Sequence, residues 1–296
     1  MSIQKGETVE DQTTTLRRMT GGLQATLPAG AVQVMAVTSG KGGVGKTNVV
    51  ANLAIALARE GRRVLVVDAD LGLANLDVLL GLVPTYTLEH VLTGEKRLGD
   101  ILLPGPGGIT ILPASSGVQD LTALTCDQQL LLQDEFDSLP LEIDTLLIDT
   151  GAGISSNVLY FAVAAQEILV VASPEPTSIT DAYALMKVLS IRFSERRFRL
   201  LVNMARSPQE GIEVYRKIGL VADRYLNISI DYVGTIPLDD YVPMAVRQQR
   251  AVTDLYPKAP ASCEFRRLAG AVMRWSASDA PKGSVQFFWQ RLIAQG

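Results

Sequence analysis

The residues from Gly40 to Thr47 read GKGGVGKT, and this spacing fits the phosphate-binding pattern GxxxxGK[ST]. The loop directly follows an apolar run and directly precedes a helical one, which is the context that the pattern requires. Glycines let successive backbone N–H groups turn towards phosphate oxygens, and the following helix directs its positive end at the same anion. We therefore expect Lys46 to reach the β and γ phosphates of ATP and the Thr47 hydroxyl to ligate Mg²⁺. The predicted nucleotide-binding residues of this loop are Gly40, Lys41, Gly42, Gly43, Val44, Gly45, Lys46, Thr47 and Asn48.

Three carboxylates follow two other apolar runs. Asp149 ends TLLID, where a carboxylate can hold Mg²⁺ directly or through water. Asp68 and Asp70 end VVDAD and project to one side of an extended chain, because they are two residues apart. We expect Asp70 to orient the attacking water and Asp68 to support Mg²⁺ indirectly. Each of these acidic residues could instead cap a strand end or a helix.

The elements that must position these groups alternate along the chain. Short β-branched runs predict strands, and amphipathic stretches between most of them predict helices. Continuous apolar strands separated by helices imply an α/β fold with a mostly parallel central sheet covered by helices on both faces. Ligands then bind at the carboxyl ends of the strands. The predicted strands are 32–39, 64–70, 109–114, 145–150, 167–174, 198–204 and 231–237, and the predicted helices are 48–60, 126–140, 156–165, 180–191, 211–226, 261–275 and 284–296.

Bulk properties exclude several classes of protein. With 47% hydrophobic and 20% charged residues, the chain can bury a continuous core. No apolar stretch has the length of a membrane span, and the N-terminus lacks a secretory signal, so we expect a cytoplasmic protein. The net charge of −4 argues against direct nucleic-acid binding. The basic cluster Arg192, Arg196, Arg197 and Arg199 is interpreted as a solvated helix end before a strand.

Three segments together resemble the MinD/ParA family of deviant Walker A ATPases: SGKGGVGKT with its second lysine at Lys41, VVDADLGLANLD and LLIDTGAG. The resemblance extends from Val32 to Gln295. It implies slow, partner-regulated hydrolysis of ATP, and it implies that Lys41 reaches across an ATP-bound homodimer to the phosphates of the other subunit. Asn48 replaces a threonine found in many members, which should alter α-phosphate contacts at most. The implied catalytic residues are Lys41, Lys46 and Asp70, the implied Mg²⁺ site is Thr47, Asp68 and Asp149, and the implied adenine contacts are Asn203 and Asp239.

Residues 1–31 form a polar arm that resembles the partner-binding arm of the flagellar-number branch of this family, FlhG or FleN. A longer match to the same branch covers 203–252. The resemblance implies control of flagellar number and placement, with the GTPase FlhF and the transcriptional activator FleQ as partners. A division-site MinD and a ParA-type cargo-positioning ATPase remain the alternatives. The implied partner-binding residues are Asp11, Gln12, Leu16 and Arg17.

The C-terminal residues 276–296 form a break followed by an amphipathic pattern, after an ATPase domain predicted to span 32–275. Their apolar stripe predicts reversible association with the inner face of the cell membrane. A helix docked on the protein's own core would show the same pattern. The predicted membrane-binding residues are Val285, Phe288, Trp289, Leu292 and Ile293, with Gln286 on the opposite face.

Overall fold

The computed structural model describes residues 32–72, 75–114, 123–275 and 286–287. Within these ranges no helix is both long and apolar enough to cross a membrane. Two sets of predicted residues lie outside the described residues, so the structure does not address them. They are the arm residues Asp11, Gln12, Leu16 and Arg17, and the tail residues Val285, Phe288, Trp289, Leu292 and Ile293.

The described residues form an eight-stranded sheet in the order β3-β4-β2-β5-β1-β6-β7-β8. All neighbouring strands pair in parallel except β3 and β4. The seven predicted strands are confirmed, whereas β3 was missed because it has two residues, one of them Pro104. The strands are β1 (Gln33–Ser39), β2 (Val64–Ala69), β3 (Leu103–Pro104), β4 (Thr110–Leu112), β5 (Thr145–Ala152), β6 (Glu167–Ala172), β7 (Arg197–Ala205) and β8 (Ser229–Pro237).

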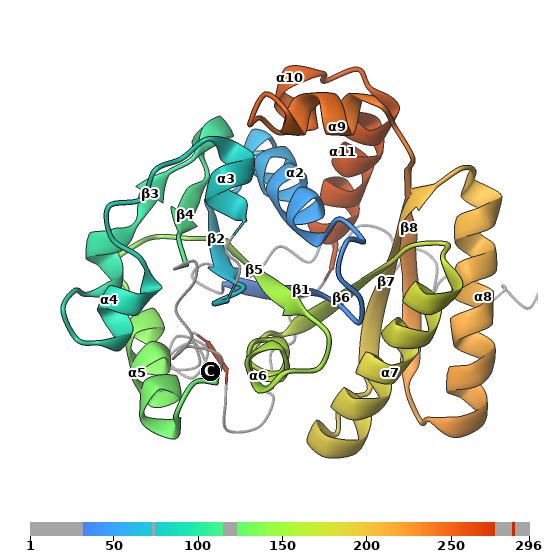
Figure 1. Cartoon of the computed structure of the whole chain (residues 1–296), viewed down its shortest axis with the longest axis horizontal. Coiled ribbons are helices and arrows are strands. Elements are labelled where there is room, and N and C mark those ends of the chain that lie inside the picture. Colours follow the sequence, from blue (N-terminus) through green and yellow to red (C-terminus); the bar gives the residue numbers. More distant parts are fainter. Residues whose placement is uncertain (1–31, 73–74, 115–122, 276–285, 288–296) are drawn as a thin grey trace, which may run out of the picture.

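Helices cover both faces of the sheet, as predicted (Figure 1). Alternate strand residues divide between the two faces: Met35 and Val37 of β1 face α2, α3 and α9–α11, whereas Val34 and Ala36 face the layer of α4–α8. The helices are α2 (Lys46–Arg59), α3 (Leu76–Leu80), α4 (Leu88–Leu92), α5 (Cys126–Asp137), α6 (Ser156–Val163), α7 (Pro176–Phe193), α8 (Pro208–Tyr225), α9 (Tyr241–Val246), α10 (Val252–Leu255) and α11 (Pro260–Val272), with short 3₁₀ turns at Leu98–Ile101 and Pro106–Gly108.

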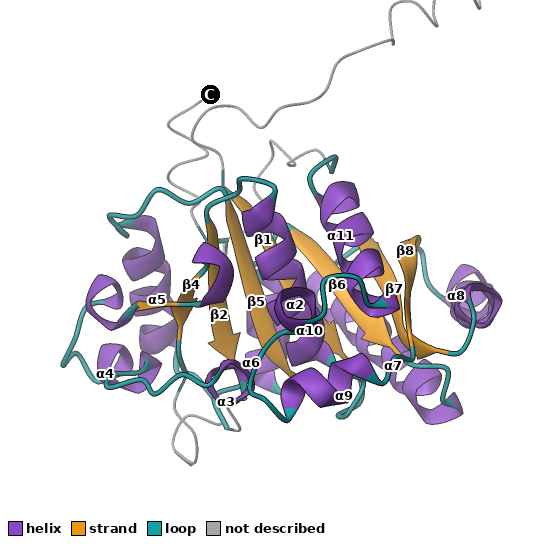
Figure 2. Ribbon diagram, turned by 90° about the horizontal axis from the view of Figure 1, so that it is seen from above, coloured by secondary structure: helices purple, strands orange, loops and turns teal. Residues whose placement is uncertain are grey.

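The position of β1 decides where a ligand can bind. From β1 the chain passes through α2 to β2 on one side of the sheet, while β6, β7 and β8 extend on the other side. Ligands of open parallel sheets bind at such a switch point, beside the carboxyl ends of the strands. Figure 2, seen from above, shows α3 and α9 next to this edge of the sheet.

The basic cluster at the end of α7 and the start of β7 is exposed at Arg192, Arg196 and Arg197, as predicted, but not at Arg199. Arg199 donates from Nε to Glu167 (2.9 Å) and from Nη1 to Asp231 (3.2 Å), on the two flanking strands. Its guanidinium also lies 3.9 Å from the ring centre of Trp275. Arg199 therefore joins three strands to Trp275, three residues after α11, because the register of β6, β7 and β8 places two carboxylates beside it.

The described part of the C-terminal tail packs on the protein itself. Phe287 is fully buried against Phe136 of α5 and Phe161 of α6, and its N–H donates to the Ala164 carbonyl (3.3 Å). Gln286, which the helical pattern placed on the polar face, is also buried. The prediction for Gln286 is wrong because the tail is anchored at Phe287 in a cluster of aromatic rings, a contact that the periodicity did not indicate.

Candidate nucleotide-binding site

Two glycines of the predicted phosphate-binding loop are required by their surroundings. A β-carbon on Gly40 would lie 2.0 Å from the backbone oxygen of Asp181 in α7, which leaves no room for any side chain. Gly45 has φ of 85°, and its β-carbon would lie 2.5 Å from the Asn203 amide nitrogen. The loop is therefore packed directly between α7 and the end of β7.

Two buried side chains, Asn203 and Ser39, donate hydrogen bonds to backbone carbonyls of the same loop. Asn203 donates from Nδ2 to the Val44 carbonyl (2.8 Å), and Ser39 donates from Oγ to the Lys41 carbonyl (2.8 Å). Helix α2 starts at Lys46, and its N-cap residue, Gly45, provides no side-chain cap. The first N–H groups of α2 are consequently available to an anion at the loop.

Two carboxylates meet below the loop because of the strand register. Asp68 of β2 pairs with Asp149 of β5, and both are almost fully buried. The Asp68 carboxylate accepts hydrogen bonds from the N–H groups of Asp70, Asn75 and Leu76, each at 3.1 Å. These bonds connect the acidic pair to the start of α3.

Burial shifts the titration of both carboxylates. It raises the pKa of Asp68, with the neighbouring Asp149 adding to the rise and the three N–H donors opposing it. Burial also raises the pKa of Asp149, although the Thr47 hydrogen bond and the Lys46 charge oppose the shift. Two adjacent buried carboxylates need either a proton or a cation to neutralise them.

The residues at this position fit a magnesium ion. Within the described residues, Oδ1 of Asp149 is buried and has no hydrogen-bond partner. Mg²⁺ prefers oxygen ligands, and Asp149 and the Thr47 hydroxyl offer two of them. Asp68 lies next to this pair and could hold a water ligand. The orphaned carboxylate oxygen is the observation that supports a cation here.

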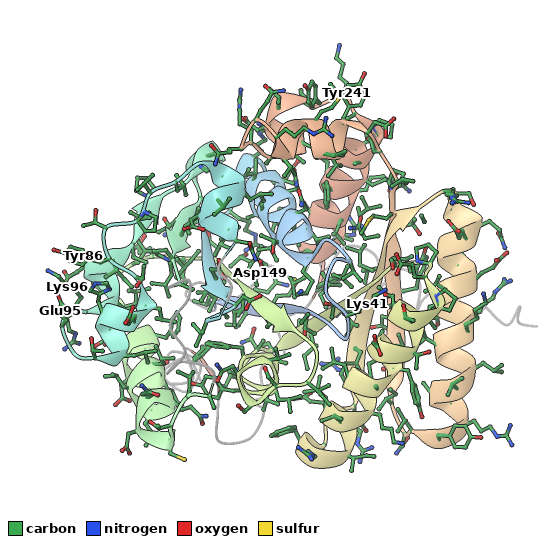
Figure 3. All side chains as sticks on the ribbon, in the orientation of Figure 1. Lys41, Tyr86, Glu95, Lys96, Asp149 and Tyr241 are labelled. Atoms are coloured by element: carbon green, nitrogen blue, oxygen red, sulfur yellow. The ribbon has the colours of Figure 1, made fainter. Side chains whose placement is uncertain are left out.

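A cavity of about 770 Å³ is lined by the phosphate-binding loop and by residues of α3. Seven of the predicted residues line it: Gly42, Gly43, Gly45, Lys46, Thr47, Asn48 and Asp70. Asp149 lies in the middle of the sheet and Lys41 lies apart from it, towards α7 (Figure 3). The other lining residues are Asn75, Val78, Leu79, Gly151, Ala152, Ser155, Val246 and Gln249.

Lys41 is turned towards its own chain. Its ammonium group forms an ion pair with Glu175 and donates to the Thr177 hydroxyl (2.8 Å) at the start of α7. The Lys41 and Glu175 side chains are 35% and 64% exposed, so the ion pair lies in contact with water. Lys41 would have to leave these partners in order to contact a second subunit.

Asn203 and Asp239, predicted to hold adenine, each have a structural partner in this chain. Asn203 binds the loop carbonyl described above, and Asp239 accepts hydrogen bonds from the N–H groups of Tyr241 (2.9 Å) and Ala261 (2.9 Å). Asp239 therefore fixes the start of α9 and of α11. Their contact with adenine stays a prediction.

Sequence reasoning missed several residues at the cavity. Gly151 comes two residues after Asp149, within the segment LLIDTGAG, which could have indicated it, and Ser155 lies two residues beyond that segment. Glu175, the N-cap residue of α7, and Thr177, in its first turn, were missed as the partners of Lys41; they do not line the cavity. No sequence signal points to Gln249, which reaches the cavity from a part of the chain about 200 residues after the loop.

A central parallel sheet, a glycine-rich loop at its switch point and an adjoining carboxylate pair define a P-loop nucleotide-binding protein. Residues 35–252 match the model of the CobQ/CobB/MinD/ParA nucleotide-binding domain family. The chain belongs to this family.

Relatives with described roles cover most of the chain. The antiactivator FleN of Pseudomonas aeruginosa is 51% identical over 262 residues, which are 88% of this chain and 94% of that protein. The flagellum site-determining protein YlxH of Helicobacter pylori is 33% identical over 268 residues, covering 89% and 90%.

Solved structures agree with the fold. The Aquifex aeolicus MinD in its complex with MinC has a TM-score of 0.67 at 27% identity, covering 85% of this chain and all of that one. The Pyrococcus horikoshii MinD, solved with Mg-ADP, has a TM-score of 0.66 at 26% identity, covering 82% and 96%. The fold is thus that of the MinD/ParA nucleotide-binding ATPases.

Proposed function

We propose that this protein is an ATP-dependent dimerising switch that controls flagellar number and placement. The observation that carries the proposal is the 51% identity with the antiactivator FleN over nearly the whole of both chains. The match to a flagellum site-determining protein of a second organism supports the same role. The partner implied by the word antiactivator is a transcriptional activator, which FleQ would represent; FlhF is the second candidate partner.

The site geometry supports hydrolysis of ATP to ADP and phosphate. Lys46 and the glycine-loop N–H groups bind the phosphates, while Thr47 and Asp149, with Asp68 beside them, hold Mg²⁺. Bound Mg²⁺ would neutralise charge that develops on the transferred phosphate. Asp70 lines the cavity and can orient the attacking water. Turnover is slow and regulated by partners, because the ATP-bound state of the protein carries the signal and the products of hydrolysis do not.

Dimerisation couples to the nucleotide through Lys41. In the single chain Lys41 is held by Glu175 and Thr177. In the ATP-bound dimer it exchanges these partners for phosphates of the other subunit. The tail residues Val285, Phe288, Trp289, Leu292 and Ile293 contact the membrane weakly in one chain and more strongly when two tails act together.

A count of flagella per cell by electron microscopy tests this function. Deleting the gene in the source bacterium should change flagellar number or position while cell division stays normal. Normal flagella with misplaced septa would instead assign the same ATPase to division-site control. Complementation with the intact gene is the control.

A further inference from the structure

The turn after α9 has a glutamine where the backbone favours glycine. Gln249 has φ of 52°, in the left-handed region. Its N–H donates to the Val246 carbonyl (2.9 Å), and the N–H of Arg250 donates to the Ala245 carbonyl (3.1 Å). This pair of bonds is a Schellman turn, in which glycine is the usual left-handed residue because a β-carbon strains that conformation. A non-glycine residue in this conformation strains the backbone, and such strain is found most often at functional sites.

The Gln249 side chain reaches across the cavity rim to α3. Its Nε2 donates to the Val78 carbonyl (3.2 Å), although the two residues are 171 positions apart in the chain. The two segments also lie close together at Gly81, the residue that follows α3, since a β-carbon there would lie 3.3 Å from Cβ of Gln249. Val78 and Gln249 both line the nucleotide cavity.

Helix α3 is also bonded to the acidic pair, at its N-terminal end. The Asp68 carboxylate accepts the N–H groups of Asn75 and Leu76, and it accepts that of Asp70 as well. A helix of five residues is too short to hold its own shape in water. Because α3 and Asp70 share the Asp68 carboxylate, a contact that fixes α3 also limits the movement of Asp70.

Helix α10, which begins three residues after Gln249, is itself bonded to α2, the helix that follows the phosphate-binding loop. Thr253 donates from its N–H and its hydroxyl to Oδ1 of Asn52 in α2, both at 2.9 Å. Arg59, at the end of α2, donates to the Thr253 carbonyl (2.6 Å). Gln249 therefore bridges α3 to a segment that is bonded to α2.

We propose that Gln249 is a positioning residue for ATP hydrolysis: its amide holds α3, and through Asp68 the catalytic Asp70, in place over the bound phosphates. The inference rests on the proposed ATPase function. Loss of the amide should slow turnover and leave ATP binding unchanged, since the glycine loop and Lys46 keep their contacts.

Replacing Gln249 by glycine separates this role from folding. Gln249→Gly removes the amide and relieves the left-handed strain, so the melting temperature should stay the same or rise. We expect kcat for Mg-ATP to fall about fivefold, the loss of one hydrogen bond in the transition state, with KM unchanged. Gln249→Glu keeps the length of the side chain, removes the donor and should lower kcat equally.

A matched control lies one residue earlier. Gln248→Ala removes an amide of the same turn, which bonds Met244 and Tyr256 and not α3, and should leave kcat unchanged. The proposal is overturned if Gln249→Gly and Gln249→Glu both retain the parental kcat. An equal loss of kcat in Gln248→Ala would overturn it too, because a general disturbance of the turn would then explain the effect.

Hydrogen exchange distinguishes failure of this inference from failure of the proposed function. If the parental protein binds ATP without hydrolysing it, the ATPase proposal fails, and the tether is then tested by amide exchange. The N–H groups of Leu79 and Leu82, which bond Asn75 and Asp77, should exchange about fivefold faster in Gln249→Gly than in the parent. Equal exchange rates would overturn the tether.

Discussion

The nucleotide cavity has two unlike walls. One wall consists of the glycine loop and α2, a helix of 14 residues that is buried along most of its length. The opposite wall consists of α3 and the turn after α9, with helices of five and six residues joined by a hydrogen bond between exposed residues. The first wall has the rigidity needed to bind the phosphates of the nucleotide in one position. The second wall has few contacts to break, so it can change position when the nucleotide binds or is hydrolysed.

The largest expected effects come from replacing Asp70, which shares the Asp68 carboxylate with α3, and Lys46, at the start of α2. Asp70→Ala should lower ATP turnover on the order of 10² to 10⁴-fold, the usual contribution of a group that handles the attacking water, while ATP-bound dimers persist. Lys46→Ala, at the start of α2, should instead prevent productive ATP binding. Phosphate release and gel filtration with ATP measure both effects. An Asp70→Ala protein that stays monomeric with ATP would contradict the switch mechanism.

The acidic pair between the two walls gives the protein a pH-dependent stability. The pKa values of Asp68 and Asp149 are raised in the folded state, so folding takes up protons above the ordinary Asp pKa of 3.8. Their contribution is complete below that value, and the free energy of unfolding should then fall as pH rises towards the raised values.

Urea unfolding of the nucleotide-free protein in chelator, from about pH 4.5 to 8, measures this fall. Asp149→Asn should flatten it, and Mg-ATP should flatten it in the parental protein because the cation replaces the proton. The lowered pKa of Asp144, caused by its hydrogen bonds with Arg63, affects stability mainly below the ordinary Asp value of 3.8, so it lies outside this range; the comparison with Asp149→Asn assigns the slope to the acidic pair. A slope identical in both proteins would show that another group is responsible.

The smallest expected effect concerns Lys41, in the phosphate-binding loop, and its ion pair with Glu175. Glu175→Gln removes the charge that holds Lys41 in the single chain, and it should strengthen the ATP-bound dimer by up to about fivefold, as expected for an exposed ion pair. Sedimentation with ATP measures the dimer. Glu142→Gln is the control, since Glu142 pairs with Arg63 at another surface. A weaker dimer in Glu175→Gln would mean that Glu175 assists Lys41 instead of restraining it.

The sequence predicted the elements whose pattern is local. Seven strands and the longer helices have enough residues to show a period, and the glycine loop and the three acidic residues occur in short motifs. The helices α3, α4, α9 and α10 have four to six residues and show no period, so they were not predicted.

The unpredicted part of the site depends on distant contacts. Glu175 reaches Lys41 over 134 positions and Gln249 reaches Val78 over 171, so neither partner can be read from spacing. The same holds for Arg199, whose carboxylate partners come from two neighbouring strands. Phe287 shows the limit of helical periodicity, because burial of one ring in an aromatic cluster decided where the tail is anchored.

The close approach of Gly40 to Asp181 also has a mechanical meaning. Helix α7 abuts the phosphate-binding loop near its first turns and extends for 18 residues, or about 27 Å, to Phe193. A rigid rod pivoting by about 5° at the loop would move its far tip by roughly 2 Å. At that tip Ile191 and Phe193 are 65% and 42% exposed. The end of α7 that is far from the phosphate-binding loop thus carries exposed apolar side chains. A partner bound to this surface would contact the residues that such a pivot displaces most.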